Sequence, residues 1–90
     1  MAKKNQFILF VSGMSDKSAH AVENLRKIAD TYFTDDYEIE IIDISRDKDQ
    51  AINYQIIGIP TLIRIAPEPK RIVLGDLSNK EKVLRLLDII

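Results

Sequence analysis

This 90-residue chain contains no cysteine, so its hydroxyl groups and its single imidazole are the first candidates for a nucleophile and its base. Ser15 and Ser18 lie at the expected start of a helix, but a nucleophilic serine needs an adjacent base, and the sequence places none near them. His20 is the only histidine, and one histidine cannot assemble a zinc site or a Ser–His–acid array. We interpret the two serines as helix-capping residues, with Asp16 as the alternative to Ser15 for the cap itself, and His20 as an exposed helix residue. We predict neither enzymatic activity nor a cofactor.

An acidic run is the second group that could do chemistry. It comprises Asp35, Asp36, Glu38, Glu40 and Asp43. A metal site needs ligands that converge on one point, whereas these side chains alternate along a predicted strand. We therefore expect Glu38 and Glu40 to line the wet face of an edge strand.

Basic side chains gather in the second half of the chain. Arg64, Lys70 and Arg71 could cluster at a hairpin, and further basic residues follow on the predicted last helix. Two interpretations have equal weight: the basic residues keep the surface soluble, or they form a patch on which a partner docks.

A proline opens the apolar run that follows Gly58. Pro60 cannot donate to a sheet ladder, so it belongs at the first residue of a strand, and we expect Gly58 to supply the freedom that the preceding turn needs. A small α/β domain with such a proline at its third strand resembles the thioredoxin superfamily, in which this proline is usually cis. Redox-active members begin the first helix with Cys-x-x-Cys, where this chain has Ser15 and Ser18.

Length and composition predict one domain covering residues 1–90. The net charge of −1 gives no general attraction to nucleic acid or to anionic membranes. No apolar run approaches the roughly 20 residues of a membrane span. The first apolar stretch, residues 7–11, is typical of a strand and not of a signal peptide. We expect a cytoplasmic protein.

Apolar periodicity predicts the order β-α-β-α-β-β-α. Asp47 with Gln50, and Ser78 with Glu81, have the spacing of capping boxes at the second and third helices. Two strand–helix–strand crossovers predict parallel neighbours, and the final hairpin adds antiparallel strands. The expected fold is a thioredoxin-like α/β domain with helices on both faces of the sheet. The predicted strands cover residues 6–12, 37–44, 60–65 and 71–74, and the predicted helices cover residues 16–33, 48–54 and 79–90.

Three segments of the second half resemble a single family. They are Ile59-Pro60-Thr61-Leu62, Pro67-x-Pro69-x-Arg71-Ile72 and the block Gly-Asp-Leu-Ser-Asn-Lys-Glu-Lys-Val-Leu at residues 75–84. Together they strongly resemble the KaiB family of small cyanobacterial circadian clock proteins. The resemblance implies partner binding without catalysis. Family members dock on the N-terminal ATPase ring of the clock ATPase KaiC, and in cyanobacteria they then capture KaiA and compete with a sensor histidine kinase.

The resemblance also implies a change of fold. In the family, a resting tetramer has the order β-α-β-β-α-α-β, and the binding-competent monomer is thioredoxin-like. By this resemblance Pro60, Pro67 and Pro69 are elements of the switch, and Gly75-Asp76 begins the segment that changes register. The predicted capping box and helical stripe of the C-terminal region favour the thioredoxin-like monomer for this chain.

Several residues depart from the pattern of the cyanobacterial relatives. This chain has Pro67-Glu68-Pro69 where they usually have three prolines, and His20 and Gln55 where they commonly carry basic residues. The sequence ends at Ile90, without the acidic tail common in the family. Three alternatives stay open. They are the thioredoxin-like sensor domain of a KaiC-interacting histidine kinase, a KaiB relative in stress or timing signalling, and a thiol-free glutaredoxin-like enzyme or glutathione binder, against which the missing cysteine argues.

Overall fold

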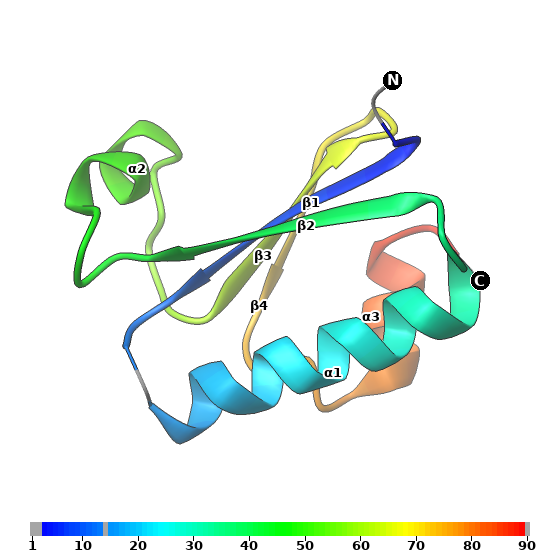
Figure 1. The fold of residues 1–90 in the computed structure, drawn as a ribbon, viewed down its shortest axis with the longest axis horizontal. Helices are drawn as coiled ribbons and strands as arrows, with labels where there is room; N and C mark the ends of the chain where they lie inside the picture. Colours follow the sequence, from blue (N-terminus) through cyan, green and yellow to red (C-terminus); the bar gives the residue numbers. More distant parts are fainter. Residues whose placement is uncertain (1–2, 14, 90) are drawn as a thin grey trace.

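A computed structural model describes residues 3–13 and 15–89 of the chain (Figure 1). The order β-α-β-α-β-β-α confirms the predicted fold and differs from the β-α-β-β-α-α-β alternative. The elements are β1 (Asn5–Val11), α1 (Asp16–Tyr32), β2 (Tyr37–Asp43), α2 (Lys48–Asn53), β3 (Thr61–Ala66), β4 (Arg71–Leu74) and α3 (Lys80–Leu86).

The four strands form one sheet in the order β2-β1-β3-β4. The first crossover makes β1 and β2 parallel neighbours, as predicted. The second prediction of parallel neighbours is wrong, because β3 lies beside β1 and runs antiparallel to it. Six residues of α2 span only about 9 Å, against about 23 Å for the seven residues of β2. The chain therefore does not return along the sheet, and β3 begins where β2 ends: both Ile42 and Thr61 pair with Phe10.

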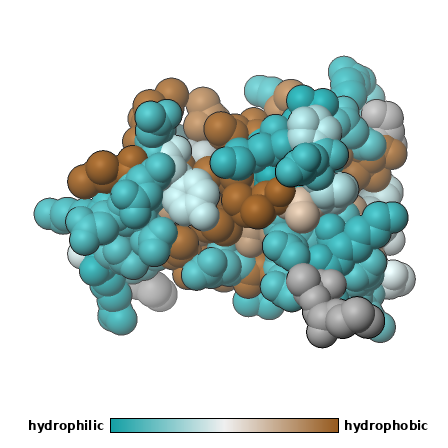
Figure 2. Space-filling view, turned by 90° about the horizontal axis from the view of Figure 1, so that it is seen from above, coloured by the Kyte–Doolittle hydropathy of each residue, from teal (hydrophilic) through white to brown (hydrophobic). Residues whose placement is uncertain are grey.

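Helices α1 and α3 lie on the same side of the sheet (Figure 1). The opposite face buries Ile8, Phe10, Ile42 and Ile63. It is covered by the segment that joins α2 to β3, and Tyr54 of this segment lies with its ring centroid 5.5 Å from that of Phe10. Helix α2 itself contributes no buried residue. On the side of the molecule away from α1 and α3, apolar groups consequently remain visible between hydrophilic side chains (Figure 2).

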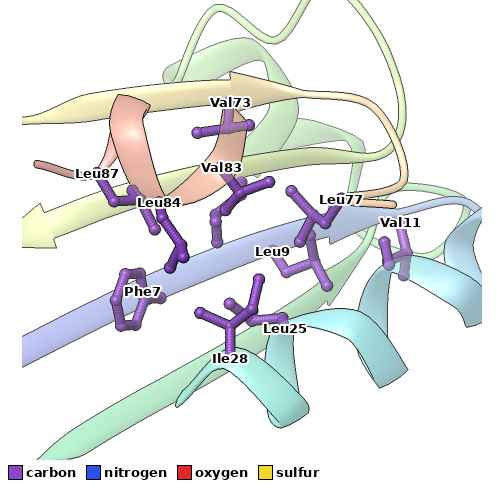
Figure 3. Close-up of a cluster of buried hydrophobic side chains, with 12 residues drawn as sticks. Phe7, Leu9, Val11, Leu25, Ile28, Val73, Leu77, Val83, Leu84 and Leu87 are labelled. Atoms are coloured by element: carbon purple, nitrogen blue, oxygen red, sulfur yellow. The ribbon is translucent and has the colours of Figure 1, made fainter. Parts of the chain in front are cut away.

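The larger core cluster fills the space between the sheet and helices α1 and α3 (Figure 3). Phe7 and Leu9 of β1 alternate with Ile8 and Phe10, which belong to the cluster on the other face. This central strand is therefore apolar on both parities because both of its faces are covered. The larger cluster comprises Phe7, Leu9, Val11, Ala21, Leu25, Ile28, Leu62, Val73, Leu77, Val83, Leu84 and Leu87.

Side-chain caps begin the helices. Of the two predicted caps of α1, Ser15 is the one observed, and it accepts a hydrogen bond from the Ser18 amide at 3.2 Å. Asp47 caps α2, as predicted. The predicted cap of α3 is wrong: Asn79, and not Ser78, accepts from the Lys82 amide at 3.1 Å.

Two contacts explain why the α3 helix starts one residue later than predicted. The Asp76 carboxylate accepts from the Ser78 amide at 3.0 Å, so this residue completes a turn instead of opening the helix. Glu81, the predicted partner in the capping box, pairs with Arg85 at 2.8 Å. Leu77, which lies between Asp76 and Ser78, has φ 65° and is buried in the core.

The three prolines flank β3. Pro60 directly precedes this strand, and Pro67 and Pro69 lie in the turn that joins it to β4. The peptide bonds preceding Pro60, Pro67 and Pro69 are all cis. The expectation for Gly58 is wrong, because its φ lies outside the left-handed region. Gln55, with φ 56°, has this conformation instead, at the end of α2. Gly75 does need its freedom, since it has φ 104° at the end of β4, where its amide donates to the Pro60 carbonyl at 3.0 Å.

Asp43 joins the ends of the two parallel strands. Its Oδ1 accepts from the Gly13 amide at 2.9 Å, and from the amide and hydroxyl of Ser45 at 3.0 and 2.6 Å. The Ser45 hydroxyl first, and then the Gly13 and Ser45 amides, lower the pKa of this carboxyl below its ordinary value. Asp43 thus has a structural role within the acidic run, because it satisfies two backbone amides.

This pKa predicts a pH-dependent contribution to stability. A carboxyl with a lowered pKa in the folded state stabilises the fold above its unfolded pKa, and the contribution is lost as pH falls below about 4. Asp43→Asn should lower the free energy of unfolding at pH 7, and the difference from the wild type should shrink at pH 3. Urea unfolding at the two pH values measures this. Asp49→Asn, at an exposed position of α2, controls for the loss of one negative charge. A difference that stays constant would contradict the prediction.

Candidate partner-binding surface

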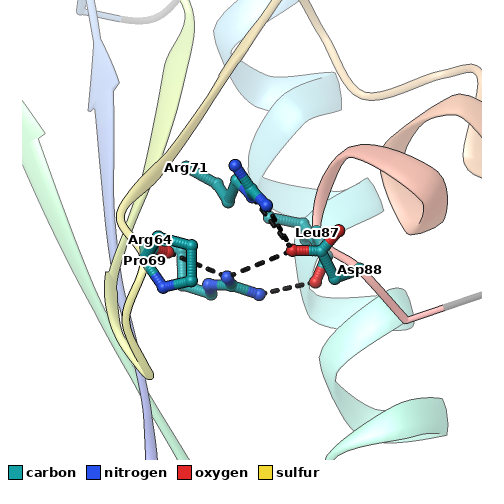
Figure 4. Close-up of polar contacts among 5 residues, drawn as sticks. All are labelled: Arg64, Pro69, Arg71, Leu87 and Asp88. Carbon is teal, nitrogen blue, oxygen red and sulfur yellow. Dashed lines mark hydrogen bonds and ion pairs between the residues drawn. The ribbon is translucent and has the colours of Figure 1, made fainter.

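Arg64 is buried, with 6% of its surface exposed. Its Nη1 donates to the Leu87 carbonyl at 2.5 Å, and its Nη2 donates to the Pro69 carbonyl at 2.9 Å (Figure 4). The Asp88 carboxylate lies 3.7 Å from the same Nη2. The guanidinium therefore connects β3, the hairpin and the end of α3. The expectation that Arg64 contributes to a surface patch is wrong, because its charge is used inside the molecule.

Arg71 contacts the same carboxylate from β4. Its Nε and Nη2 donate to Asp88 Oδ2 at 3.0 and 2.8 Å (Figure 4). Asp88 directly follows Leu87, the cap residue of α3, and has φ 59°. The structure thus brings Arg64 and Arg71 together around an acidic residue that the sequence analysis missed. No local pattern marks Asp88, because its partners lie 17 and 24 positions away in the sequence.

Of the three predicted basic residues, only Lys70 is exposed. Its ammonium lies 5.8 Å from the centroid of the Tyr54 ring, within the range of a cation–π contact. Among the described residues Lys70 forms no ion pair, and its role in docking stays a prediction.

Large apolar side chains lie exposed beside Tyr54. Ile57 is 88% exposed, and Ile72 and Leu74 of β4 are 55% and 54% exposed. They border a hollow of about 200 Å³, into which Tyr54 also faces. We call Tyr54, Ile57, Lys70, Ile72 and Leu74 the β4 surface. The sequence analysis predicted only Lys70 of this set as a binding residue, because a four-residue strand carries too little alternation to tell its exposed face.

The segment that follows β4 is tied to α1. Asn24 Nδ2 donates to the Asp76 carbonyl at 2.9 Å. The Ser78 hydroxyl and amide, and to a smaller extent His20 and Lys17, lower the pKa of the Asp76 carboxyl. The predicted switch residues Gly75 and Asp76 therefore belong to an ordered turn between β4 and α3.

The hydroxyl and imidazole candidates lie at the start of α1. The Ser15 hydroxyl donates to Ser18 Oγ at 2.8 Å, and Ser18 Oγ accepts from the Ser12 amide at 3.1 Å. Ser18 is buried and His20 is exposed. The two hydroxyls thus close the loop between β1 and α1 and satisfy its amides, as expected of capping residues.

The acidic run lies along an edge of the sheet, as predicted. Glu38 and Glu40 are exposed on β2, the first strand in the sheet order. Asp36 and Glu38 accept from the amides of Lys4 and Lys3 at 3.0 and 3.3 Å. Among the residues that the structure describes, no three His, Cys, Asp or Glu side chains are grouped closely enough to hold a metal ion. Within the same residues, no helix has the length and apolar character needed to cross a membrane.

These features define a thioredoxin-like α/β fold, in which β3 is opened by Pro60. Solved structures with the same architecture include the N-terminal domain of SasA from Synechococcus elongatus. That domain is similar with a TM-score of 0.77 and 19% identity, over 100% of this chain and 89% of that one. Mitochondrial thioredoxin 3 from Saccharomyces cerevisiae is similar with a TM-score of 0.75 and 15% identity, over 96% and 79% of the two chains.

Sequence comparison identifies the family within this fold class. The model of the KaiB domain matches residues 8–89. Circadian clock protein KaiB3 from a Synechocystis species is 39% identical over 82 residues, which are 91% of this chain and 80% of the relative. The circadian clock oscillator protein KaiB from Prochlorococcus marinus is 37% identical over 92 residues, covering 100% and 88%. The chain belongs to the KaiB family.

The Arg64 contacts predict a large and local stability effect. Arg64→Met keeps the aliphatic stem but leaves two carbonyls without their donor, so it should lower the free energy of unfolding by about 3 kcal/mol. Arg71→Met is the matched control, and its half-exposed ion pair should contribute about 1 kcal/mol or less. Urea unfolding followed by circular dichroism measures both. Equal losses in the two variants would contradict the assigned role of Arg64.

Proposed function

We propose that this chain is a non-catalytic clock-type binding protein that docks on a KaiC-type ATPase. Membership of the KaiB family over residues 8–89 carries the proposal. The structure supports a binding role through the β4 surface, where apolar side chains are exposed beside a free ammonium group. Protein interfaces commonly combine an apolar centre with a polar rim.

The hydroxyls at the start of α1 support the non-catalytic part of the proposal. Ser15 and Ser18 hydrogen-bond to each other and to backbone amides, so their oxygens serve the local structure. We extend the proposal to the partners implied by the family resemblance. In the cytoplasm, the docked protein would capture a KaiA-type protein or compete with a sensor histidine kinase. A role in a stress or timing system built on a KaiC-like ATPase uses the same docking step.

We further propose that a fold switch regulates docking. The β-α-β-α-β-β-α chain presents the β4 surface, whereas a refolded second half would take β4 and α3 apart. Arg64 supports this view, because its hydrogen bond to the Leu87 carbonyl exists only while the end of α3 lies against the sheet.

The fold preference has a direct test. Sedimentation velocity should give a monomer, and the NMR secondary shifts of residues 80–86 should be helical, since capping and the Arg64 contacts stabilise α3 in this position. A tetramer whose shifts after residue 85 are those of a strand would rule out the thioredoxin-like monomer as the populated state.

Docking through the β4 surface predicts a site-specific charge effect. Lys70→Glu reverses the exposed ammonium without removing an internal ion pair, and should weaken binding to a KaiC-type hexamer in the presence of ATP by about tenfold. This corresponds to about 1.4 kcal/mol. Lys82→Glu on α3, across the sheet, is the matched control and should bind like the wild type. Biolayer interferometry with the immobilised hexamer measures both.

Two results would contradict this proposal. Wild-type protein that does not bind the hexamer in any nucleotide state would exclude the ATPase as a partner. Equal affinities of Lys70→Glu and the wild type would show that docking uses another surface.

A further inference from the structure

We propose that β4 receives an extended segment of the partner as a fifth strand of the sheet. The segment carries apolar side chains at alternate positions and a carboxylate that meets Lys70. This inference rests on the proposed function and specifies how the partner binds at the β4 surface.

The backbone of β4 has free hydrogen-bonding groups toward solvent. β4 is the last strand in the sheet order, and it pairs with β3 through Leu74 opposite Thr61 and Ile72 opposite Ile63. The Gly75 amide donates across the ladder to Pro60, and inward-facing groups alternate in an antiparallel pair. The backbone amides and carbonyls of Arg71 and Val73 therefore point toward β3. Those of Ile72 and Leu74 point outward, where an added strand can pair with them.

The two edges of the sheet differ in their protection against strand addition. Exposed Glu38 and Glu40 lie on the β2 edge, and charged side chains discourage pairing with another strand. β4 presents Ile72 and Leu74 instead, and its one charged residue, Arg71, is neutralised by Asp88. β2 also exposes Ile41, at 40%, next to Glu40, so the β4 edge is the less protected of the two against strand addition.

The β4 surface also indicates the chemistry of the added strand. Side chains at alternate positions of a strand point to the same face, so a strand beside Ile72 and Leu74 would place apolar groups over the hollow of about 200 Å³. Tyr54 lines this hollow and lies under the Lys70 ammonium. An acidic residue next to the apolar ones would therefore come within reach of Lys70.

The charge of β4 argues against a second copy of this strand as the occupant. Pairing of β4 with β4 of another molecule would bring the sequence Lys70-Arg71-Ile72-Val73-Leu74 to the edge. This segment contains two basic residues and no carboxylate, so it offers nothing that complements Lys70. We therefore assign the edge to a different protein, with self-association as an outcome that the experiment detects.

Amide hydrogen exchange tests strand addition directly. In the free chain the outward amides of Ile72 and Leu74 should exchange fast and that of Val73 slowly. In the complex with a KaiC-type hexamer and ATP, the first two should become protected, and fragmentation mass spectrometry resolves them. Ile72→Ala and Ile72→Pro remove the same apolar contact, but only proline removes the outward amide. The proline variant should bind about tenfold more weakly than the alanine variant, as expected for one hydrogen bond.

Each outcome decides a different part of the inference. Binding with unprotected Ile72 and Leu74 amides would overturn strand addition and leave the proposed docking intact. Equal affinities of folded Ile72→Ala and Ile72→Pro variants would also overturn strand addition. If the proline variant does not fold, the amide exchange of the wild-type complex decides the question. A wild-type chain that does not bind the hexamer would overturn both proposals. Protection of these amides in the chain alone at high concentration, with a dimer in sedimentation, would make a second copy the occupant.

Discussion

A buried guanidinium is the interaction on which the second half of this structure depends. A charge inside a protein is tolerated when hydrogen bonds replace its water, and Arg64 obtains them from the Leu87 and Pro69 carbonyls. The Leu87 carbonyl lies at the negative end of α3, where a positive charge is favourable. Because the donors lie on β3 and the acceptors on two other segments, one side chain ties the hairpin to the end of α3.

This arrangement separates the two faces of the sheet by function. One face carries α1 and α3 and holds most of the core. The other is covered only by the α2–β3 connection and leaves the β4 surface partly open, with Ile57, Ile72 and Leu74 exposed. In our proposal the closed face maintains the fold, while the open face and its free edge bind the partner. A thioredoxin-like scaffold with serines at the start of α1 is suited to this use, since its hydroxyls are engaged in capping.

Local patterns predicted the elements well, and failed where distant segments decide. The β1 strand is apolar on both parities, and Ser15 and Asp47 have the side chains and spacing of caps, so these elements were readable from neighbouring residues. The direction of β3 was not, because it depends on how far α2 carries the chain across the sheet. The cap of α3 also moved by one residue, because Asp76 takes the Ser78 amide and Glu81 pairs with Arg85.

The amino-acid sequence by itself determined the order of the elements, the absence of thiol chemistry and the membership of the KaiB family. Each of these is written in residue types and short spacings. Only the tertiary structure decided that Arg64 is an internal anchor, that Asp88 is its neighbour and that Lys70 stands beside an apolar hollow. An arginine in a strand has the same local pattern whether it is buried or exposed. Its environment is set by residues 23 positions away in the chain, which packing alone brings into contact.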